Sequence, residues 1–199
     1  MSLHLVLHAL AVKKHADAPV LAEFTGLSQA DVARLLGEAA GSGRVVAAQG
    51  KYVLAPLARL ALDGHYAREY ANVRANATFL QAYENFERIN VQLKTLITDW
   101  QTIEVGGARV ANDHSDASYD IRIVDRLGNL HERTDRILAQ LVQGLPRLEY
   151  YRRKLTEALE RAEDGHSEWV SDARLPSYHT LWFELHEDLL RILGRRRAE

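Results

Sequence analysis

The chain has 199 residues, of which 47% are hydrophobic and 26% are charged, and it contains no cysteine. This composition indicates a globular protein with one sizeable core or two small ones, and it excludes a disordered chain, a disulfide framework and a thiolate metal site. No apolar run approaches the roughly twenty residues of a membrane span. The net charge is −2, although residues 1–66 carry six bases and five acids, a net +1. Charge alone therefore neither excludes nor indicates a nucleic-acid partner.

The first fifteen residues, MSLHLVLHALAVKKH, are apolar but do not read as a signal peptide. They have no basic leading region and no small-residue cleavage site. Their apolar residues Leu3, Val6, Leu7 and Leu10 recur at helical spacing, which predicts a first helix over residues 3–12. We therefore expect a folded N-terminal helix and a cytoplasmic protein.

Two further helices are predicted, over residues 20–24 and 28–40, joined by a short turn that contains a glycine. Ser28 suits the N-cap of the second of these, and Asp31 adds a carboxylate to its first turn. Glycines in the segment 41–43 end this helix. Its apolar positions recur at three- and four-residue steps, at Val32, Leu35, Leu36 and Ala39.

A β-hairpin is predicted directly after this helix. Residues 44–48 are rich in β-branched side chains, residues 51–54 form the return strand, and Gln49-Gly50 has the length and the glycine of a tight turn. Helix, short helix, glycine turn, helix and hairpin follow one another in the order of a helix-turn-helix with an appended wing.

The segment LAEFTGLSQADVARLLGEAAGSGRVV, residues 21–46, resembles the winged-helix domain of bacterial transcription regulators. The resemblance covers about the first third of the chain and implies double-stranded DNA as a partner. It implies that the first exposed residues of the third helix face the major groove and that the hairpin reaches a phosphate or the minor groove. The residues that it assigns to DNA contact are Ser28, Gln29, Ala30, Arg34, Arg44 and Lys51, with Ala33 beside them.

Beyond Pro56, residues 57–62 are predicted to form a linking helix that Gly64 ends or kinks, and from about His65 the chain is expected to be helical to its end. We therefore predict a winged helix-turn-helix domain over residues 1–64 and a helical domain over residues 65–199. The fold class is mainly α, with the second domain an antiparallel helical bundle.

The first long helix of the second domain has an apolar seam with one polar member, Asn90. The seam runs through Phe79, Tyr83, Phe86, Asn90, Leu93, Ile97 and Trp100. We interpret Asn90 as a hydrogen-bonded residue that sets the register of packing, with a ligand contact as the alternative. Residues 102–115 lack periodicity and are expected to be irregular. Helical spacing resumes over residues 119–142, again after Pro146, and again after Pro176.

Histidines and acids gather in two places of the second domain. His179 and His186 lie two helical turns apart, and Asp113 and His114 lie in the irregular segment. A seven-residue spacing holds the two histidines too far apart for one metal ion, so we predict no metal site and no cofactor. Partly buried structural histidines are one interpretation, and a small-molecule pocket is the other. The predicted ligand-binding residues are Trp100, Asp113, His114, Tyr119, His179, Trp182 and His186.

The segments TDWQ at 98–101, NDHSD at 112–116 and SYHTLWFELHEDLL at 177–190 look like those of bacterial proteins labelled MarR-like transcriptional regulators. Such a resemblance spans nearly the whole chain and implies no particular ligand. The chain differs from true MarR proteins in having no arm before the helix at residue 3. Dimerisation is therefore expected through the C-terminal helices, as in PadR-type regulators.

These observations predict a dimeric DNA-binding transcriptional regulator that responds to a small molecule in its helical domain. The alternative is a winged-helix protein-interaction module that does not bind DNA, since the third helix carries the acids Asp31 and Glu38 and only one base. An enzyme is not predicted, because the sequence has no nucleophile elbow, no phosphate-binding glycine motif and no metalloprotease signature.

Overall fold

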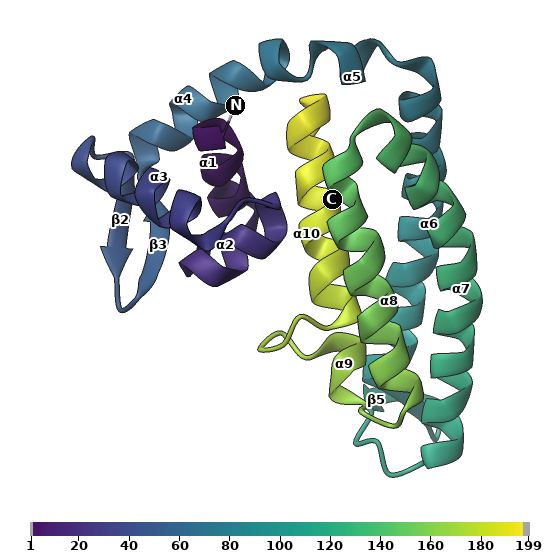
Figure 1. The fold of residues 1–199 in the computed structure, drawn as a ribbon. Coiled ribbons are helices and arrows are strands. Elements are labelled where there is room, and N and C mark those ends of the chain that lie inside the picture. Colours follow the sequence, from purple (N-terminus) through teal and green to yellow (C-terminus); the bar gives the residue numbers. More distant parts are fainter. Residues whose placement is uncertain (1, 197–199) are drawn as a thin grey trace. The chain divides into compact units, whose positions relative to one another are not determined.

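A computed structural model describes residues 2–196 of the chain, and it is mainly helical with small antiparallel sheets (Figure 1). The chain divides into two compact units. The first contains the residues up to Ala75 together with those from Glu184 onward, and the second runs from Asn76 to Phe183. The first unit extends to Ala75, past the predicted boundary between residues 64 and 65, and it also includes the C-terminal part of the last helix.

The first unit is built from helices around a small sheet. Its elements are α1 (Ser2–Lys13), β1 (His15–Ala16), α2 (Ala18–Thr25), α3 (Gln29–Gly41), β2 (Val45–Ala48), β3 (Lys51–Leu54), α4 (Pro56–Glu69), α5 (Ala71–Ala75) and, from Glu184, the end of α10 (Tyr178–Leu193). The helices predicted over residues 3–12, 20–24 and 28–40 and the predicted hairpin are present, with ends within two residues of those expected. The two-residue strand β1 was not predicted.

Local capping explains where α2 and α3 begin and end. The carboxylate of Asp17 accepts a hydrogen bond from the amide of Val20, and the hydroxyl of Ser28 accepts one from the amide of Asp31. Gly26, which ends α2, has a φ of 70°, a conformation that suits glycine because it has no Cβ. The apolar stripe predicted for α3 is buried, at Val32, Leu35, Leu36 and Ala39.

The sheet of the first unit has the strand order β1-β3-β2, and both pairs are antiparallel. In the β2–β3 hairpin, Ala48 pairs with Lys51, so that Gln49 and Gly50 alone form the turn. Their φ angles of 51° and 74° are those of a type I′ turn, whose twist matches that of the two strands. The turn predicted from the sequence is therefore confirmed.

Helix α4 corrects one expectation. Gly64 does not end it, because the helix continues to Glu69. A glycine inside a helix costs roughly 1 kcal/mol relative to alanine. Three side chains of α4 are buried, Ala58 and Leu62 before the glycine and Tyr66 after it, and their burial outweighs that cost.

A hydrogen-bonded chain of three polar side chains lies in the core of the first unit. The imidazole of His8 is fully buried between two partners. Its Nδ1 lies 2.8 Å from the hydroxyl of Tyr66, and its Nε2 lies 2.9 Å from a carboxylate oxygen of Asp188, which is also fully buried. These contacts join α1, α4 and α10, which explains why the C-terminal residues belong to this unit.

The second unit is a helical bundle with an added hairpin. Its elements are α6 (Ala77–Gln101), β4 (Thr102–Val105), β5 (Ala108–Ala111), α7 (Ala117–Gly144), the 3-10 turn η1 (Pro146–Leu148), α8 (Glu149–Glu163), α9 (Glu168–Ser171) and the first residues of α10. Helices α6, α7 and α8 run alongside one another (Figure 1). The expectation of a mainly helical second domain is confirmed.

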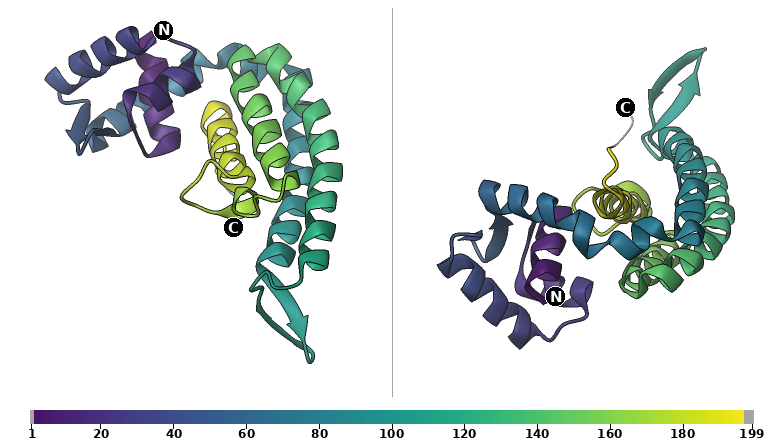
Figure 2. Two further views of the ribbon diagram at one scale, coloured as in Figure 1. Left: turned by 60° about the horizontal axis from the view of Figure 1, so that its bottom comes forward. Right: turned by 90° about the horizontal axis from the view of Figure 1, so that it is seen from above.

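The hairpin β4–β5 replaces the irregular segment predicted over residues 102–115, and it shows that the chain is not continuously helical from His65 onward. Thr102 pairs with Ala111 and Val105 with Ala108. Gly106 and Gly107, with φ angles of 61° and 81°, supply the two-residue turn. The hairpin extends beyond the ends of α6 and α7 (Figure 2).

The seam of α6 is buried as predicted, and Asn90 is part of it. Asn90 is 5% exposed, and its side-chain oxygen accepts a hydrogen bond of 2.9 Å from the indole nitrogen of Trp182. Trp182 also stacks on Phe86, with ring centroids 4.7 Å apart. The interpretation of Asn90 as a hydrogen-bonded packing residue is confirmed.

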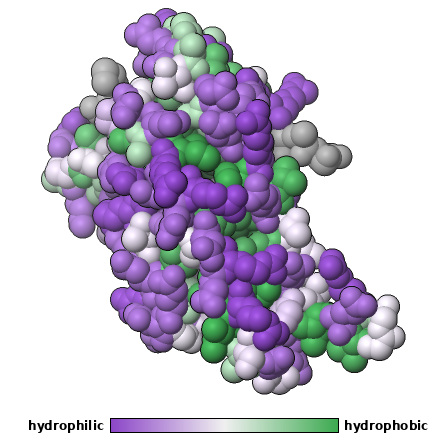
Figure 3. All heavy atoms as spheres, turned by 90° about the vertical axis from the view of Figure 1, so that its right-hand side faces the viewer, coloured by the Kyte–Doolittle hydropathy of each residue, from purple (hydrophilic) through white to green (hydrophobic). Residues whose placement is uncertain are grey.

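The surface of the second unit that Figure 3 presents is mainly hydrophilic, with scattered hydrophobic side chains. Val91 on α6, a residue of this unit, is 64% exposed. Within residues 2–196, no helix is both long and apolar enough to cross a membrane.

Candidate functional site

The residues predicted to contact DNA lie on one stretch of the first unit, from the start of α3 to the hairpin. Gln29 and Ala30 are exposed in the first turn of α3. Ser28 is exposed as well, but its hydroxyl accepts from the amide of Asp31 and donates to the carboxylate of the same residue at 2.7 Å. Ser28 therefore serves first as the cap that starts the helix, and Gln29 and Ala30 are the side chains that the first turn presents.

Arg34 is paired within its own helix. Its guanidinium lies 2.8 Å from a carboxylate oxygen of Glu38 and 3.6 Å from one of Asp31. The hydrogen bond to Glu38 is the main reason why the pKa of Arg34 is raised. Because the side chain is 58% exposed, water screens both pairs and an incoming anion competes with them at little cost.

Arg44 and Lys51 are exposed bases at opposite ends of the hairpin. Arg44 precedes β2, where its carbonyl accepts from the amide of Ala55, and Lys51 begins β3 next to the turn. Four residues of extended chain separate Arg44 from Ala48, the strand partner of Lys51, which corresponds to about 13 Å. Within the described part of the chain, neither side chain has a carboxylate partner. They are available cations beside α3.

The predicted ligand-binding residues fall into separate places. Trp100 and His114 are brought together, with ring centroids 4.5 Å apart. Tyr119 lies nearby, but its hydroxyl is used within the fold, since it donates to the backbone carbonyl of Asp99 at 2.7 Å. Asp113 is exposed, and a hydrogen bond from the hydroxyl of Ser115, followed by one from its backbone amide, lowers the pKa of the Asp113 carboxyl.

The members of the set on α10 do not form a site with these. Trp182 is 2% exposed and belongs to the bundle core through Phe86 and Asn90. His179 is half-buried, and burial lowers its pKa. His186 is 3% exposed and belongs to the first unit. The structure therefore brings Trp100 and His114 together and leaves the α10 residues in packing roles.

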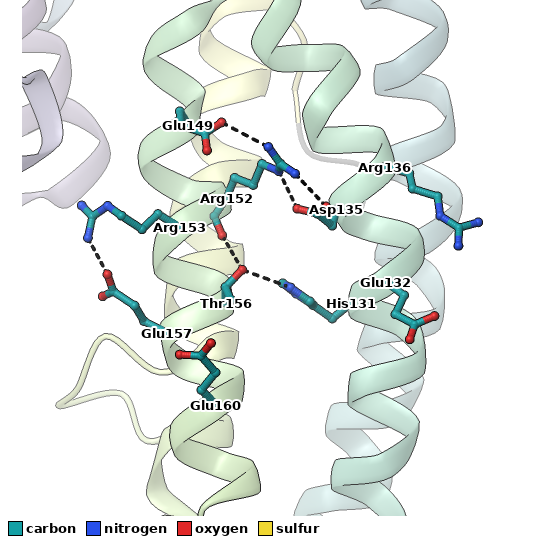
Figure 4. Close-up of a pocket in the computed structure, with 10 residues that line it drawn as sticks. All are labelled: His131, Glu132, Asp135, Arg136, Glu149, Arg152, Arg153, Thr156, Glu157 and Glu160. Carbon is teal, nitrogen blue, oxygen red and sulfur yellow. Dashed lines mark hydrogen bonds and ion pairs between the residues drawn. The ribbon is translucent and has the colours of Figure 1, made fainter.

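A polar cleft of about 890 Å³ lies between α7 and α8 (Figure 4), and sequence periodicity did not indicate it. Most of its charges neutralise one another. Arg152 binds Asp135 through two hydrogen bonds of 2.5 and 2.9 Å, and Arg153 lies 2.5 Å from Glu157. Arg136 on α7 points away from α8 (Figure 4). This arrangement is a network of ion pairs that joins two helices, and it leaves no converging set of free charges for a ligand.

His131 reaches from α7 toward α8 and is 8% exposed. Its Nδ1 lies 3.2 Å from the hydroxyl of Tyr178, and its Nε2 lies 3.3 Å from the hydroxyl of Thr156. Burial lowers its pKa, and the nearby carboxylate of Asp135 opposes this only in part. His131 is therefore neutral at pH 7 and shares hydrogen bonds with two hydroxyls.

The lowered pKa of His131 predicts that the protein loses stability as the pH falls below about 6.5, the ordinary pKa of histidine. In that range the histidine binds a proton in the unfolded chain but not in the folded chain. The unfolding free energy then falls by at most about 1.4 kcal/mol per pH unit for one proton. We expect His131→Gln to reduce the loss of unfolding free energy between neutral and mildly acidic pH, as measured by urea denaturation. His65→Gln, which removes an exposed histidine, is the control, and an unchanged pH profile for His131→Gln would contradict the expectation.

Among residues 2–196, no group of three or more histidine, aspartate and glutamate side chains is arranged to hold a metal ion. The exposed surface of α3 and the hairpin is the first of the two sites that the sequence predicts. Comparisons of the chain with protein-family models, with curated proteins and with solved structures found no match.

Proposed function

We propose that this protein is a DNA-binding transcriptional regulator and that its first unit is a winged helix-turn-helix domain. The observation that carries the proposal is the succession α2, glycine turn, α3 and β-hairpin, with an exposed first turn on α3 and two available cations, Arg44 and Lys51, on the hairpin. In helix-turn-helix proteins the second helix enters the major groove with its N-terminal residues at the base edges.

The chemistry of the surface suits this docking. Gln29 offers an amide that can pair with the N6 and N7 atoms of adenine, and the methyl group of Ala30 suits the methyl group of thymine. Arg44 and Lys51 supply the phosphate contacts that set position without reading sequence. The surface is a small one, so a second copy of the chain would be needed to gather enough phosphate contacts.

The test is the affinity of the purified protein for the DNA upstream of its own gene, measured by fluorescence anisotropy across a salt series. The logarithm of the binding constant is expected to fall with the logarithm of salt concentration, with a slope of about −0.9 for each phosphate contact. Affinity equal to that for unrelated DNA of the same length would count against a regulator, and complete absence of binding would remove the DNA function.

Two charged residues on α3, Arg34 and Glu38, predict opposite effects. Arg34→Ala is expected to weaken binding, since it removes a base from the surface that faces DNA. Glu38→Gln is expected to strengthen binding severalfold at low salt, because it removes an acid that repels phosphates and frees Arg34 from its 2.8 Å ion pair. Both variants are measured in the same anisotropy assay. Weaker binding by Glu38→Gln would show that α3 does not lie against DNA.

We also propose that the regulator acts as a homodimer through its C-terminal helices and works in the cytoplasm. A dimer places two reading helices on a two-fold symmetric operator about one helical turn apart. Light scattering at the concentrations of the DNA assay measures the mass directly. A monomeric mass in the presence and absence of DNA would remove this part of the proposal.

A second candidate function is a protein-interaction module, and one observation favours it. Leu57 and Leu60, one turn apart on α4, are 81% and 69% exposed. Exposed leucines side by side on a helix are typical of a surface that a protein partner covers. In this case association would vary little with salt, and Leu57→Ser with Leu60→Ser would abolish it while DNA affinity stayed unchanged. A DNA affinity that falls steeply with salt favours the regulator instead.

A further inference from the structure

A cavity of about 430 Å³ lies in the second unit, where the end of α6, the start of α7 and the end of α8 meet. Its volume is within the range of small-molecule sites. Among the described residues that line it there are three carboxylates and one histidine, and neither lysine nor arginine is present. The remaining lining is mostly apolar or aromatic. We call it the α6–α7–α8 cavity.

Trp100 and His114 form the aromatic side of this cavity. Trp100 is 3% exposed, and within the described chain its indole N–H has no acceptor. His114 is held in place by Asp120 at 2.9 Å and by Asn112 at 3.2 Å. A tryptophan that is nearly buried normally gives its N–H to a partner. The indole nitrogen of Trp100 is not one of the fully buried unpaired nitrogens of the described chain, so it is open to solvent and to a molecule that binds in the cavity.

Two of the three carboxylates are unpaired. Asp120 is occupied by His114 and Asn112, whereas the side chains of Asp125 and Glu163 have no hydrogen-bond or ion-pair partner in residues 2–196. An oxygen of Glu163 lies only 3.2 Å from the point where a side chain on Gly128 would begin. Positions 125 and 128 are neighbours on one helix face, about 5–6 Å apart. The two free carboxylates therefore converge on the same part of α7.

Apolar side chains of α7 complete the surface. Ile121 is 61% exposed, and Val124 lies three residues further along the same helix face. An anionic molecule would be repelled by the carboxylates, and a neutral apolar molecule would cover them without replacing their hydration. A molecule with a positive charge and an apolar body can pair with the carboxylates and also cover the apolar side chains. An aromatic ring near the charge adds a cation–π attraction.

We propose that the α6–α7–α8 cavity binds a small organic amine. Its protonated amino group would pair with Asp125 and Glu163, and its apolar body would lie against Trp100, Ile121 and Val124. Binding of the amine to the cavity does not depend on the proposed function. A second step, in which the bound amine changes the affinity for DNA, does rest on the proposed function. An effector must bind one arrangement of the protein better than another in order to act.

The test uses the indole N–H resonances of the full-length protein, of which there are three because the chain has three tryptophans. Trp100→Phe identifies the signal of Trp100. Titration with 2-phenylethylamine is expected to shift this signal to saturation and to leave those of Trp169 and Trp182 in place, which also shows that the fold is intact. Phenylacetate and 2-phenylethanol, which have the same ring without the positive charge, are expected to bind at least tenfold more weakly.

Two variants locate the amino group. Glu163→Gln and Asp125→Asn are each expected to weaken the binding of 2-phenylethylamine by about tenfold or more, the usual effect of losing one charge-assisted hydrogen bond. Asp164→Asn, next to Glu163 but outside the cavity lining, removes the same charge and is the matched control. The proposal is overturned if the amine leaves the Trp100 signal unmoved, if phenylacetate binds equally well, or if both variants bind like the unmodified protein.

The same titration distinguishes this inference from the proposed function. A saturable shift of the Trp100 signal in a protein that ignores its upstream DNA would establish the amine site and remove the regulator. Specific DNA binding together with an unmoved Trp100 signal would support the regulator and overturn the amine site.

Discussion

Replacing Asp188 by alanine is expected to lower the free energy of unfolding by about 3–5 kcal/mol, the usual cost of removing one partner from a buried pair. Asp188 and His8 are both fully buried, and their side chains lie 2.9 Å apart. Without the carboxylate, the Nε2 of His8 loses its partner in a core that water does not reach. For a chain of this length the melting temperature should fall by roughly 6–20 °C.

The protonation of Tyr66 determines which groups donate and which accept in this chain of hydrogen bonds. Burial raises the pKa of the Tyr66 hydroxyl, so it keeps its proton and can donate to the Nδ1 of His8. With Nδ1 of His8 accepting from Tyr66, Nε2 donates to the carboxylate of Asp188, and every group in the chain is paired. On this assignment Asp188→Asn, which keeps the accepting oxygen, should retain much more stability than Asp188→Ala.

Urea denaturation followed by circular dichroism measures both variants. Asp164→Ala, at an exposed position that ends α8, provides the matched loss of a carboxylate and should change the unfolding free energy by less than about 0.5 kcal/mol. If Asp188→Ala resembled that control, the buried chain would have no part in holding α1, α4 and α10 together.

The second large effect is expected from removing both bases of the hairpin. Arg44→Gln combined with Lys51→Gln should reduce DNA affinity by roughly tenfold for each lost phosphate contact at about 0.1 M salt. Each lost contact should also make the salt dependence shallower by about 0.9, and a dimer doubles the number of lost contacts. The physical reason is that both side chains are exposed and, within the described residues, are not neutralised by any acid.

Lys94→Gln is the matched control for this pair, because Lys94 is an exposed base on α6 in the second unit. It should leave the affinity and the salt slope nearly unchanged. Anisotropy measurements on specific and unrelated DNA should show that the double variant weakens binding to both, as expected for phosphate contacts that carry no sequence information. An equal effect of Lys94→Gln would mean that general charge, and not the hairpin, governs the association.

Local patterns were sufficient to predict most of the first unit. Ser28 caps α3 where its side chain can bond an amide three residues on, and Gln49-Gly50 closes the hairpin because those two residues accept positive φ angles. Both signals act within a few residues, so they can be read without knowing the fold. The buried seam of α6 was predictable for the same reason, since its period is that of one helix.

Only the tertiary structure decided the features that depend on distant residues. The partner of His8 lies 180 positions away, so no local pattern could assign the C-terminal residues to the first unit. Gly64 favoured a helix end in the sequence, yet α4 continues to Glu69 because the side chains around Gly64 are packed in the core. The strands β4 and β5 flank Gly106-Gly107, but they are only four residues each and mostly exposed, so their alternation was too weak to recognise. Trp100, Asp125 and Glu163 come from three helices, and only their packing places them around one cavity. Short-range geometry thus determined the elements, and long-range burial determined which side chains meet.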